Sequence, residues 1–176
     1  MIPVNNKVED LLNQARKYRS EGKYFNIRAL LDRADRLCAN DDYLSHGRIF
    51  TFHAQIARDR HELDYALEWY NKALKLFQKI GEIGKIAHTI RHIADIESEL
   101  GRTWQAEENY LRALEMYKLN KRTPDLDLAN AHRGFAILLD NTGNKAKAKE
   151  IWTEARDLYM KANIQAGVEE CEEHLK

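Results

Sequence analysis

Apolar residues recur along the chain at spacings of three and four, which is the period of an α-helix. Residues 106–117 show this spacing, and residues 65–77 contain the series Tyr65, Ala66, Trp69, Tyr70, Ala73, Leu74 and Phe77. No segment shows the alternation of β-branched and polar residues that is typical of a strand. Proline, which interrupts a helix, occurs only at Pro3 and Pro124. The sequence therefore predicts an all-α protein.

Short polar or glycine-containing segments separate these helical patterns at nearly regular intervals. They fall at Gly22, residues 40–42, Gly81, Gly101, residues 120–125 and residues 141–144. The stretches between them are about 15 residues long, close to the ordinary length of a helix. The predicted helix pairs are 8–21 with 24–38, 44–60 with 63–80, 83–100 with 103–119, and 126–141 with 145–162, and a last helix spans 165–175.

The same residue types recur at fixed distances from Gly22, His61, Gly101 and Gly143. Seven residues before these positions stand Ala15, Ala54, Ala94 and Ala136. Nine residues after them stand Leu31, Tyr70, Tyr110 and Trp152, and twelve residues after them stand Ala34, Ala73, Ala113 and Ala155. The chain thus contains four repeats, spaced 39, 40 and 42 residues apart. One such hairpin cannot bury its apolar face alone, so neighbouring hairpins are expected to stack.

This skeleton, with Ala-x3-Tyr/Trp-x2-Ala after the glycine, resembles the tetratricopeptide repeat (TPR) family over about residues 8–163. The usual TPR period is about 34 residues. The longer period here resembles the branch that includes kinesin light chain and the Leu-Gly-Asn-type adaptors. Two features depart from the family pattern: no repeat ends with the usual proline, and His61 replaces the glycine of the second repeat.

The resemblance implies a right-handed α-solenoid of four TPR-like helical hairpins plus a C-terminal capping helix. We expect one domain over residues 1–176, with hairpins at about 8–40, 44–81, 83–120 and 126–163 and the capping helix at 164–176. Residues 164–175 repeat the spacing of a first helix and carry four glutamates. A solvated cap needs such a polar face. The alternative is that a longer array of repeats was cut at this point.

Composition excludes several functional classes. The 28 Lys and Arg residues balance 28 Asp and Glu residues, so the net charge is zero and broad attraction to nucleic acid is not expected. No stretch approaches the roughly 20 apolar residues of a membrane span. Two cysteines are too few for a disulfide framework and have no metal-binding spacing, which favours a cytoplasmic protein.

The strongest candidate for metal chemistry is the set His88, His92 and Asp95, at positions i, i+4 and i+7 of one helix. Two histidines at this spacing can share a zinc ion. The sequence offers no fixed third histidine, so a polar surface is the favoured interpretation. No phosphate-binding loop or nucleophile elbow is found. We therefore expect a non-catalytic protein without a cofactor, in which Trp69, Trp104 and Trp152 pack between helices.

The TPR resemblance also implies a binding groove lined by the first helix of each hairpin. The ligand-binding residues it indicates are Arg16, Arg19, Arg48, Phe52, Gln55, Arg58, His88, Arg91, His92, Asn130 and Arg133. Six of them are arginines and none is a lysine, which favours an acidic protein or peptide partner, with Phe52 as an apolar anchor. Two alternatives remain: the arginines pair with acidic residues of the chain itself, or the protein is a self-assembly module that forms a homodimer.

Overall fold

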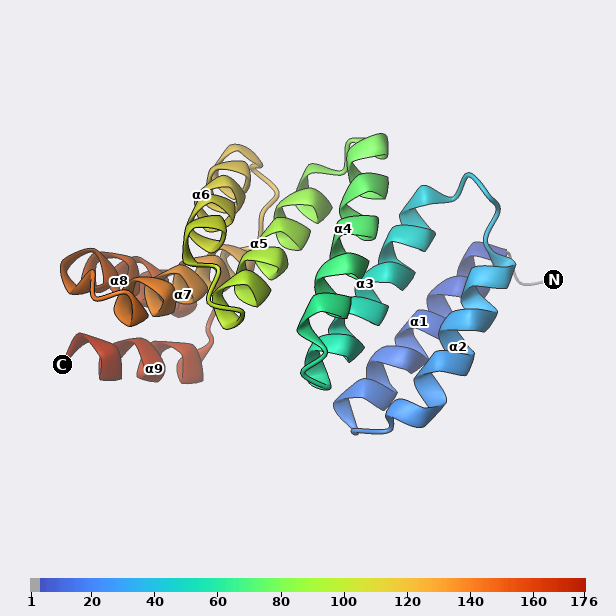
Figure 1. The fold of residues 1–176 in the computed structure, drawn as a ribbon, viewed down its shortest axis with the longest axis horizontal. Helices are drawn as coiled ribbons and strands as arrows, with labels where there is room; N and C mark the ends of the chain where they lie inside the picture. Colours follow the sequence, from blue (N-terminus) through green and yellow to red (C-terminus); the bar gives the residue numbers. More distant parts are fainter. Residues whose placement is uncertain (1–3) are drawn as a thin grey trace. The chain divides into compact units, whose positions relative to one another are not determined.

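The computed structural model describes residues 4–176, and these form nine α-helices without a strand (Figure 1). The helices are α1 (Val4–Ser20), α2 (Tyr24–Leu37), α3 (Tyr43–Asp59), α4 (Leu63–Ile80), α5 (Ile83–Glu99), α6 (Thr103–Leu119), α7 (Asp125–Asn141), α8 (Lys145–Lys161) and α9 (Gln165–Leu175). The all-α prediction is confirmed. Every helix begins and ends within one residue of its predicted bounds, except that α1 begins four residues earlier.

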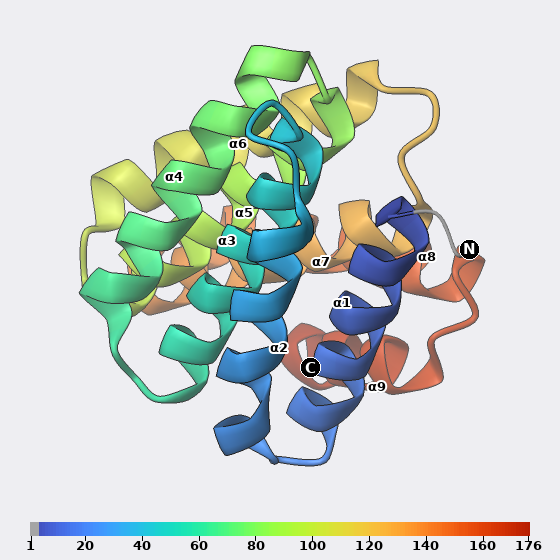
Figure 2. The same cartoon turned by 90° about the vertical axis from the view of Figure 1, so that its right-hand side faces the viewer.

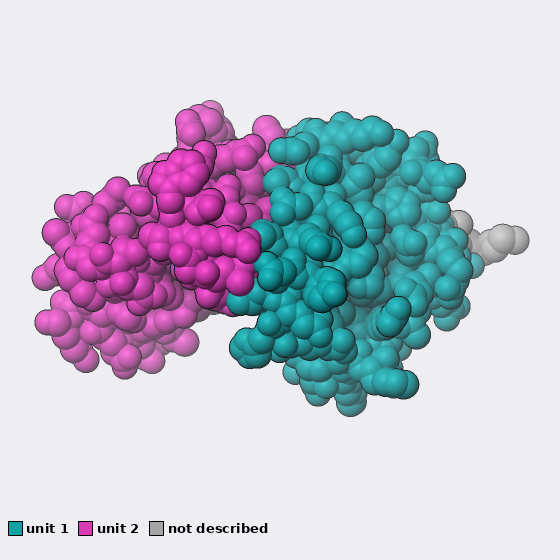
Figure 3. Space-filling view, in the orientation of Figure 1, with its two compact units in different colours: residues 1–82 teal, residues 83–176 magenta. Residues whose placement is uncertain are grey.

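The chain divides into two compact units, Met1–Glu82 and Ile83–Lys176, which Figure 3 colours separately. In unit 1, α1 pairs with α2 and α3 pairs with α4. In unit 2, α5 pairs with α6, α7 pairs with α8, and α9 packs on α8. The two helices of the α3–α4 hairpin lie side by side in both Figure 1 and Figure 2. The expectation of a single domain stays a prediction.

Each hairpin turns through one residue with a left-handed backbone conformation. The φ angles are +69° at Gly22, +58° at His61, +72° at Gly101 and +82° at Gly143. The following N–H then donates to a carbonyl five residues back, as from Glu62 to Ala57. This is the hydrogen bond of a Schellman motif, which satisfies the last carbonyls of the first helix. The four positions from which the repeat distances are counted therefore occupy equivalent turns of the four hairpins.

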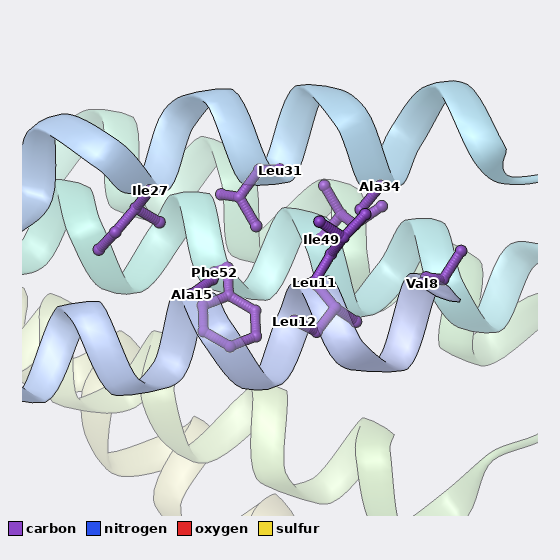
Figure 4. Packing of buried hydrophobic residues seen from close by; sticks show 9 residues of the cluster. All are labelled: Val8, Leu11, Leu12, Ala15, Ile27, Leu31, Ala34, Ile49 and Phe52. Carbon is purple, nitrogen blue, oxygen red and sulfur yellow. The ribbon is translucent and has the colours of Figure 1, made fainter. Parts of the chain in front are cut away.

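The repeated apolar positions form the core of both units. All four alanines that precede the turn are fully buried, and so are the alanines twelve residues after it. The large side chains Leu31, Tyr70, Tyr110 and Trp152 are at most 2% exposed. In unit 1, residues from α1, α2 and α3 meet in the cluster that Figure 4 shows. The repeat register is thereby confirmed.

The three tryptophans differ in their surroundings. Trp152 is 1% exposed and donates its indole N–H to Asp140 at 2.7 Å. Trp69 is half-buried, whereas Trp104 is 72% exposed near the start of α6. The prediction that all three pack between helices is wrong for Trp104, because its position lies outside the repeated core positions.

Candidate functional site

In unit 1, two of the predicted groove arginines connect the first helices α1 and α3. Arg48 donates to both carboxylate oxygens of Glu9, at 2.5 and 2.9 Å. Arg19 donates to both oxygens of Asp59, at 2.7 and 2.9 Å, and to the side-chain oxygen of Gln55 at 3.1 Å. Both arginines therefore form bidentate ion pairs, which fix geometry better than a single contact does.

The ion pair of Arg19 perturbs both of its groups. Its hydrogen bond to Asp59 raises the pKa of the guanidinium group. The same bond lowers the pKa of the Asp59 carboxyl group from its ordinary value. The charged form of each partner is thus stabilised by the other, and the positive charge of Arg19 is already compensated within the chain.

Arg16 lies on the same helix as Arg19 but has different neighbours. Its guanidinium group donates to the side-chain oxygen of Asn13 at 2.6 Å, and no described carboxylate forms an ion pair with it. The guanidinium carbon lies 5.9 Å from the centre of the Phe52 ring. Phe52 is only 7% exposed and belongs to the core of unit 1, which leaves little of the ring for a partner. Arg58 is half-buried in the last turn of α3.

In unit 2, Arg91 lies in a buried polar network on α5. Its guanidinium group donates to Asp95 at 2.9 Å, and both side chains are 10% exposed. Asp95 also accepts the hydroxyl hydrogen of Tyr110 at 2.8 Å. The network therefore joins the first helix of this hairpin to its second helix, α6.

His92 is the most strongly perturbed group of this network. Its Nε2 lies 2.7 Å from a guanidinium nitrogen of Arg91, and because that group only donates, Nε2 accepts. Burial, reinforced by the charge of Arg91, lowers the pKa of His92 from 6.5 to about 3. The imidazole is accordingly neutral at pH 7.

Two further predicted residues of unit 2 are His88, which contacts this network, and Asn130, which pairs with α8. His88 lies 3.2 Å from His92 (Nε2 to Nε2) and 3.8 Å from Asp127 (Nδ1 to Oδ1). Asn130 accepts a hydrogen bond from the Tyr159 hydroxyl at 2.8 Å. Among residues 4–176, no three His, Cys, Asp or Glu side chains are placed to hold a metal ion. His88, whose side chain is 35% exposed, thus lies at the edge of the buried network, whereas the His92 side chain is 13% exposed and lies within it.

A third bidentate ion pair connects α7 to α9. Arg133 donates to both oxygens of Glu170, at 2.7 and 2.6 Å. This hydrogen bond raises the pKa of Arg133 and lowers that of Glu170. With Arg19, Arg48 and Arg91, four of the six predicted groove arginines are paired with carboxylates of the same unit. The alternative in which groove arginines pair with acidic residues of the chain itself therefore holds for these four residues.

The repeat pattern alone did not identify the carboxylate partners of the groove arginines, although their spacing in the sequence points to them. The pairs Arg48–Glu9, Arg19–Asp59 and Arg133–Glu170 are separated by 39, 40 and 37 residues. Each separation is close to one repeat. Because equivalent positions of successive first helices lie side by side in a stack, opposite charges one repeat apart are expected to meet. The fourth pair, Arg91–Asp95, has the i, i+4 spacing of neighbours on one helix.

Residues 45–119, from α3 to α6, match the family model described as tetratricopeptide repeat. These residues are TPR repeats. No curated protein matches the chain at a significant level. Solved structures with the same fold include BtubC (BKLC) from P. vanneervenii, with a TM-score of 0.70 and 16% identity, covering 97% of this chain and 89% of that one.

Two further solved structures share the fold over nearly the whole chain. PilF of Pseudomonas aeruginosa has a TM-score of 0.68 and 16% identity, covering 98% of this chain and 76% of that one. A kinesin light chain-like protein from Podospora anserina with nearly identical TPR-like repeats has a TM-score of 0.67 and 13% identity, covering 99% of this chain and 89% of that one. At these identities the likeness establishes the fold, a TPR-like solenoid of sequential hairpins. No helix within residues 4–176 is apolar over enough of its length to span a bilayer.

Proposed function

We propose that this chain is a non-catalytic protein–protein interaction module that holds a segment of a partner protein. The observation that carries the proposal is the match of residues 45–119 to TPR repeats, since TPR proteins generally mediate such interactions. Within each unit, the packing of the hairpins holds the first helices in place for such a contact.

The partner would contact the first helices through side chains that remain accessible. In unit 1, Arg16 can pair with an acidic side chain without displacing a carboxylate of the chain. In unit 2, His88 is about one-third exposed and Arg133 is 40% exposed. Arg19, Arg48 and Arg91 instead form ion pairs within the chain. We therefore expect Arg16 to be the arginine through which the groove favours an acidic partner.

Selection from a random peptide library on the immobilised full chain tests the proposal. We expect peptides that bind one-to-one with a Kd on the order of micromolar by calorimetry. Arg16→Ala should weaken those with an acidic residue about threefold to tenfold, and added salt should do the same. Arg33→Ala, which removes an exposed arginine from α2, is the matched control and should leave binding unchanged. Failure to recover any binding peptide would contradict the proposal.

Self-assembly is a second candidate that one observation favours. Phe25 is 94% exposed and Trp104 is 72% exposed, and each stands three residues after the turn of its hairpin. Large exposed apolar side chains are frequent at interfaces between protein chains. Light scattering at increasing protein concentration separates the two functions. The mass of one chain throughout favours the interaction module, and a mass that doubles and returns to one chain in Phe25→Ser and Trp104→Ser favours self-assembly.

A further inference from the structure

Unit 1 contains a cleft on the side of its second helices, away from the predicted groove residues. It has a volume of about 490 Å³, which lies within the range of ligand pockets. The floor is formed by residues of α3, and the walls are formed by α2 and α4. The lining residues include Asp32 and Asp35 of α2, Phe50 and His53 of α3, and Tyr65 and Trp69 of α4.

The floor and one wall of the cleft are aromatic. The His53 ring stacks on Trp69, with the ring centres 4.6 Å apart and an angle of 22° between the planes. Phe50 lies 5.3 Å from the same indole ring. Lys72 places its ammonium group 4.1 Å from the centre of the Trp69 ring, so this wall already accepts one cation. Tyr65, at the rim, is 62% exposed and offers its ring to solvent.

The opposite wall is acidic at its centre. Asp32 and Asp35 lie on α2, and their charges act on His53 across the cleft. Asp35 also contacts His46 at 2.9 Å, whereas no described group forms a hydrogen bond or ion pair with Asp32. Arg28 lies one turn before Asp32, and Arg60 and Glu62 line the end of the cleft. Of the five charged lining residues three are acidic, and the ammonium group of Lys72 over Trp69 balances this excess, so the negative charge is concentrated at Asp32 and Asp35 on the α2 wall.

His53 gives the floor a neutral polar group. Burial lowers the pKa of this histidine from its ordinary value of 6.5, so the ring is uncharged at pH 7. No described residue forms a hydrogen bond with its ring nitrogens. A ligand in the cleft can therefore use one of these nitrogens as an acceptor.

The equivalent positions of unit 2 are closed. His132 stands eleven residues before Gly143, as Phe50 does before His61. Phe135 stands eight residues before Gly143, as His53 does before His61. Phe135 is 1% exposed, and its ring centre lies 5.9 Å from that of Tyr110. His132 is 2% exposed and is bonded to the Leu128 carbonyl and to Glu154. The partial exposure of Phe50 and His53 in unit 1 is thus not shared by the equivalent residues His132 and Phe135 of unit 2.

We propose that the cleft between α2 and α4 binds an arginine side chain of a partner protein. A guanidinium group suits it better than an ammonium group, because it is planar, stacks on aromatic rings and donates to two carboxylate oxygens at once. The aliphatic stem would cover Phe50, and the guanidinium group would lie between Tyr65 and Asp32. This inference rests on the proposed interaction function and adds a second contact on a different face of unit 1.

Nuclear magnetic resonance on the full chain tests the cleft with a defined probe. The probe is an acetylated and amidated peptide, Gly-Ser-Arg-Gly-Arg-Ser-Gly, compared with versions that carry citrulline or glutamate in place of arginine. We expect the arginine peptide to shift the indole N–H of Trp69 and the ring of His53, with a Kd no weaker than about 1 mM. The citrulline peptide should bind about fivefold more weakly, and the glutamate peptide should not bind the cleft.

Two pairs of variants locate the contact. Asp32→Asn with Asp35→Asn should weaken the arginine peptide about fivefold to tenfold, whereas Asp10→Asn with Asp41→Asn changes the charge of unit 1 equally and should not. Tyr65→Ser should weaken binding about threefold to fivefold, and Phe25→Ser should not. All these positions are exposed, and circular dichroism verifies that each variant is folded.

The result that overturns the proposal is equal binding of the citrulline peptide, equal loss in the control variants, or no shift at Trp69. The proposed function fails separately. If library peptides bind in the manner that depends on Arg16 while the arginine peptide does not bind, the interaction function stands and the cleft assignment falls. If the arginine peptide binds the cleft and no library peptide is recovered, the cleft assignment stands alone.

Discussion

The turn of the second hairpin is made by a histidine in the conformation that glycine adopts in the other three. His61 has a φ angle of +58°, where an L-residue is strained by roughly 1–2 kcal/mol. Part of this strain is offset, because glycine loses more backbone entropy on folding. We therefore expect His61→Gly to raise the free energy of unfolding by about 0.5–1 kcal/mol, measured by urea denaturation.

The reverse substitution, of glycine by histidine at an equivalent turn, serves as the control. Gly101→His should lower the free energy of unfolding by about 1 kcal/mol, since the φ angle of Gly101 is +72° and a side chain there has open space around it. A loss of stability in His61→Gly would mean that the imidazole makes a stabilising contact that outweighs the strain of the turn.

Arginines with similar positions in the repeat should differ in their effect on stability. Arg91 and its partner Asp95 are each 10% exposed, so Arg91→Ala leaves a buried carboxylate and should cost about 3–5 kcal/mol. Arg133 and Glu170 are 40% and 34% exposed, so Arg133→Ala should cost at most about 1 kcal/mol. Equal losses in thermal unfolding of the two variants would contradict the role of burial.

Between elements, the closest approaches are made where a glycine of a first helix faces an aromatic ring. A Cβ atom at Gly134 would lie 2.8 Å from the Tyr110 hydroxyl oxygen and 3.0 Å from Asp95. Gly134→Ala should therefore push α7 away from α6 and lower the free energy of unfolding by about 1–3 kcal/mol. In Gly84→Ala the nearest atom is 3.4 Å away, so this control should be neutral or stabilise by up to about 1 kcal/mol.

The large residue of each second helix fills the space between hairpins. Tyr110 and Trp152 are 2% and 1% exposed, and each also donates a hydrogen bond to an aspartate of the preceding first helix. Replacing either by Ala should lower the free energy of unfolding by about 3–5 kcal/mol. Lys118→Ala, on the exposed side of α6, should have little effect. Thermal melting of Tyr110→Ala at the wild-type temperature would contradict the contribution of the Tyr110 side chain to stability.

The elements were predictable because their determinants are local. Apolar spacing and the left-handed turn residues set the helix bounds to within one residue at all ends but the start of α1. The candidate site was only partly predictable, because the pairing of Arg48 with Glu9 depends on two helices being adjacent. The repeat register therefore placed Arg48 on a first helix, but it did not reveal that Glu9 compensates its charge. The cleft beside His53 depends on how far α2 stands from α3, which no residue pattern records.

For the whole molecule, the buried neutral histidines make stability depend on pH. Burial lowers the pKa values of His53 and His132, and that of His92 falls to about 3. The unfolded chain binds protons at these groups near pH 6.5, so below that pH it holds more protons than the folded chain. Their contribution to stability is fully present above about pH 6.5 and is lost as the pH falls toward about 3.

Urea midpoints between about pH 7.5 and about pH 5 measure this effect, because carboxylates titrate mostly below that range. We expect the urea midpoint to decrease steadily as the pH decreases. In His92→Gln the midpoint should change less over the same pH range. A midpoint that rises as the pH falls would show that protonated histidines stabilise the folded chain instead.

The ion pairs between neighbouring first helices also bear on how the chain folds during synthesis. Arg19 meets Asp59, Arg48 meets Glu9 and Arg133 meets Glu170, at separations of 40, 39 and 37 residues. The helices in extensive contact are likewise neighbours or next neighbours in the chain. Within each unit, a later hairpin or helix of a nascent chain can therefore pack onto the preceding hairpin as soon as about one further repeat has left the ribosome. Contact order this low allows native structure to grow from the N-terminus at the pace of translation.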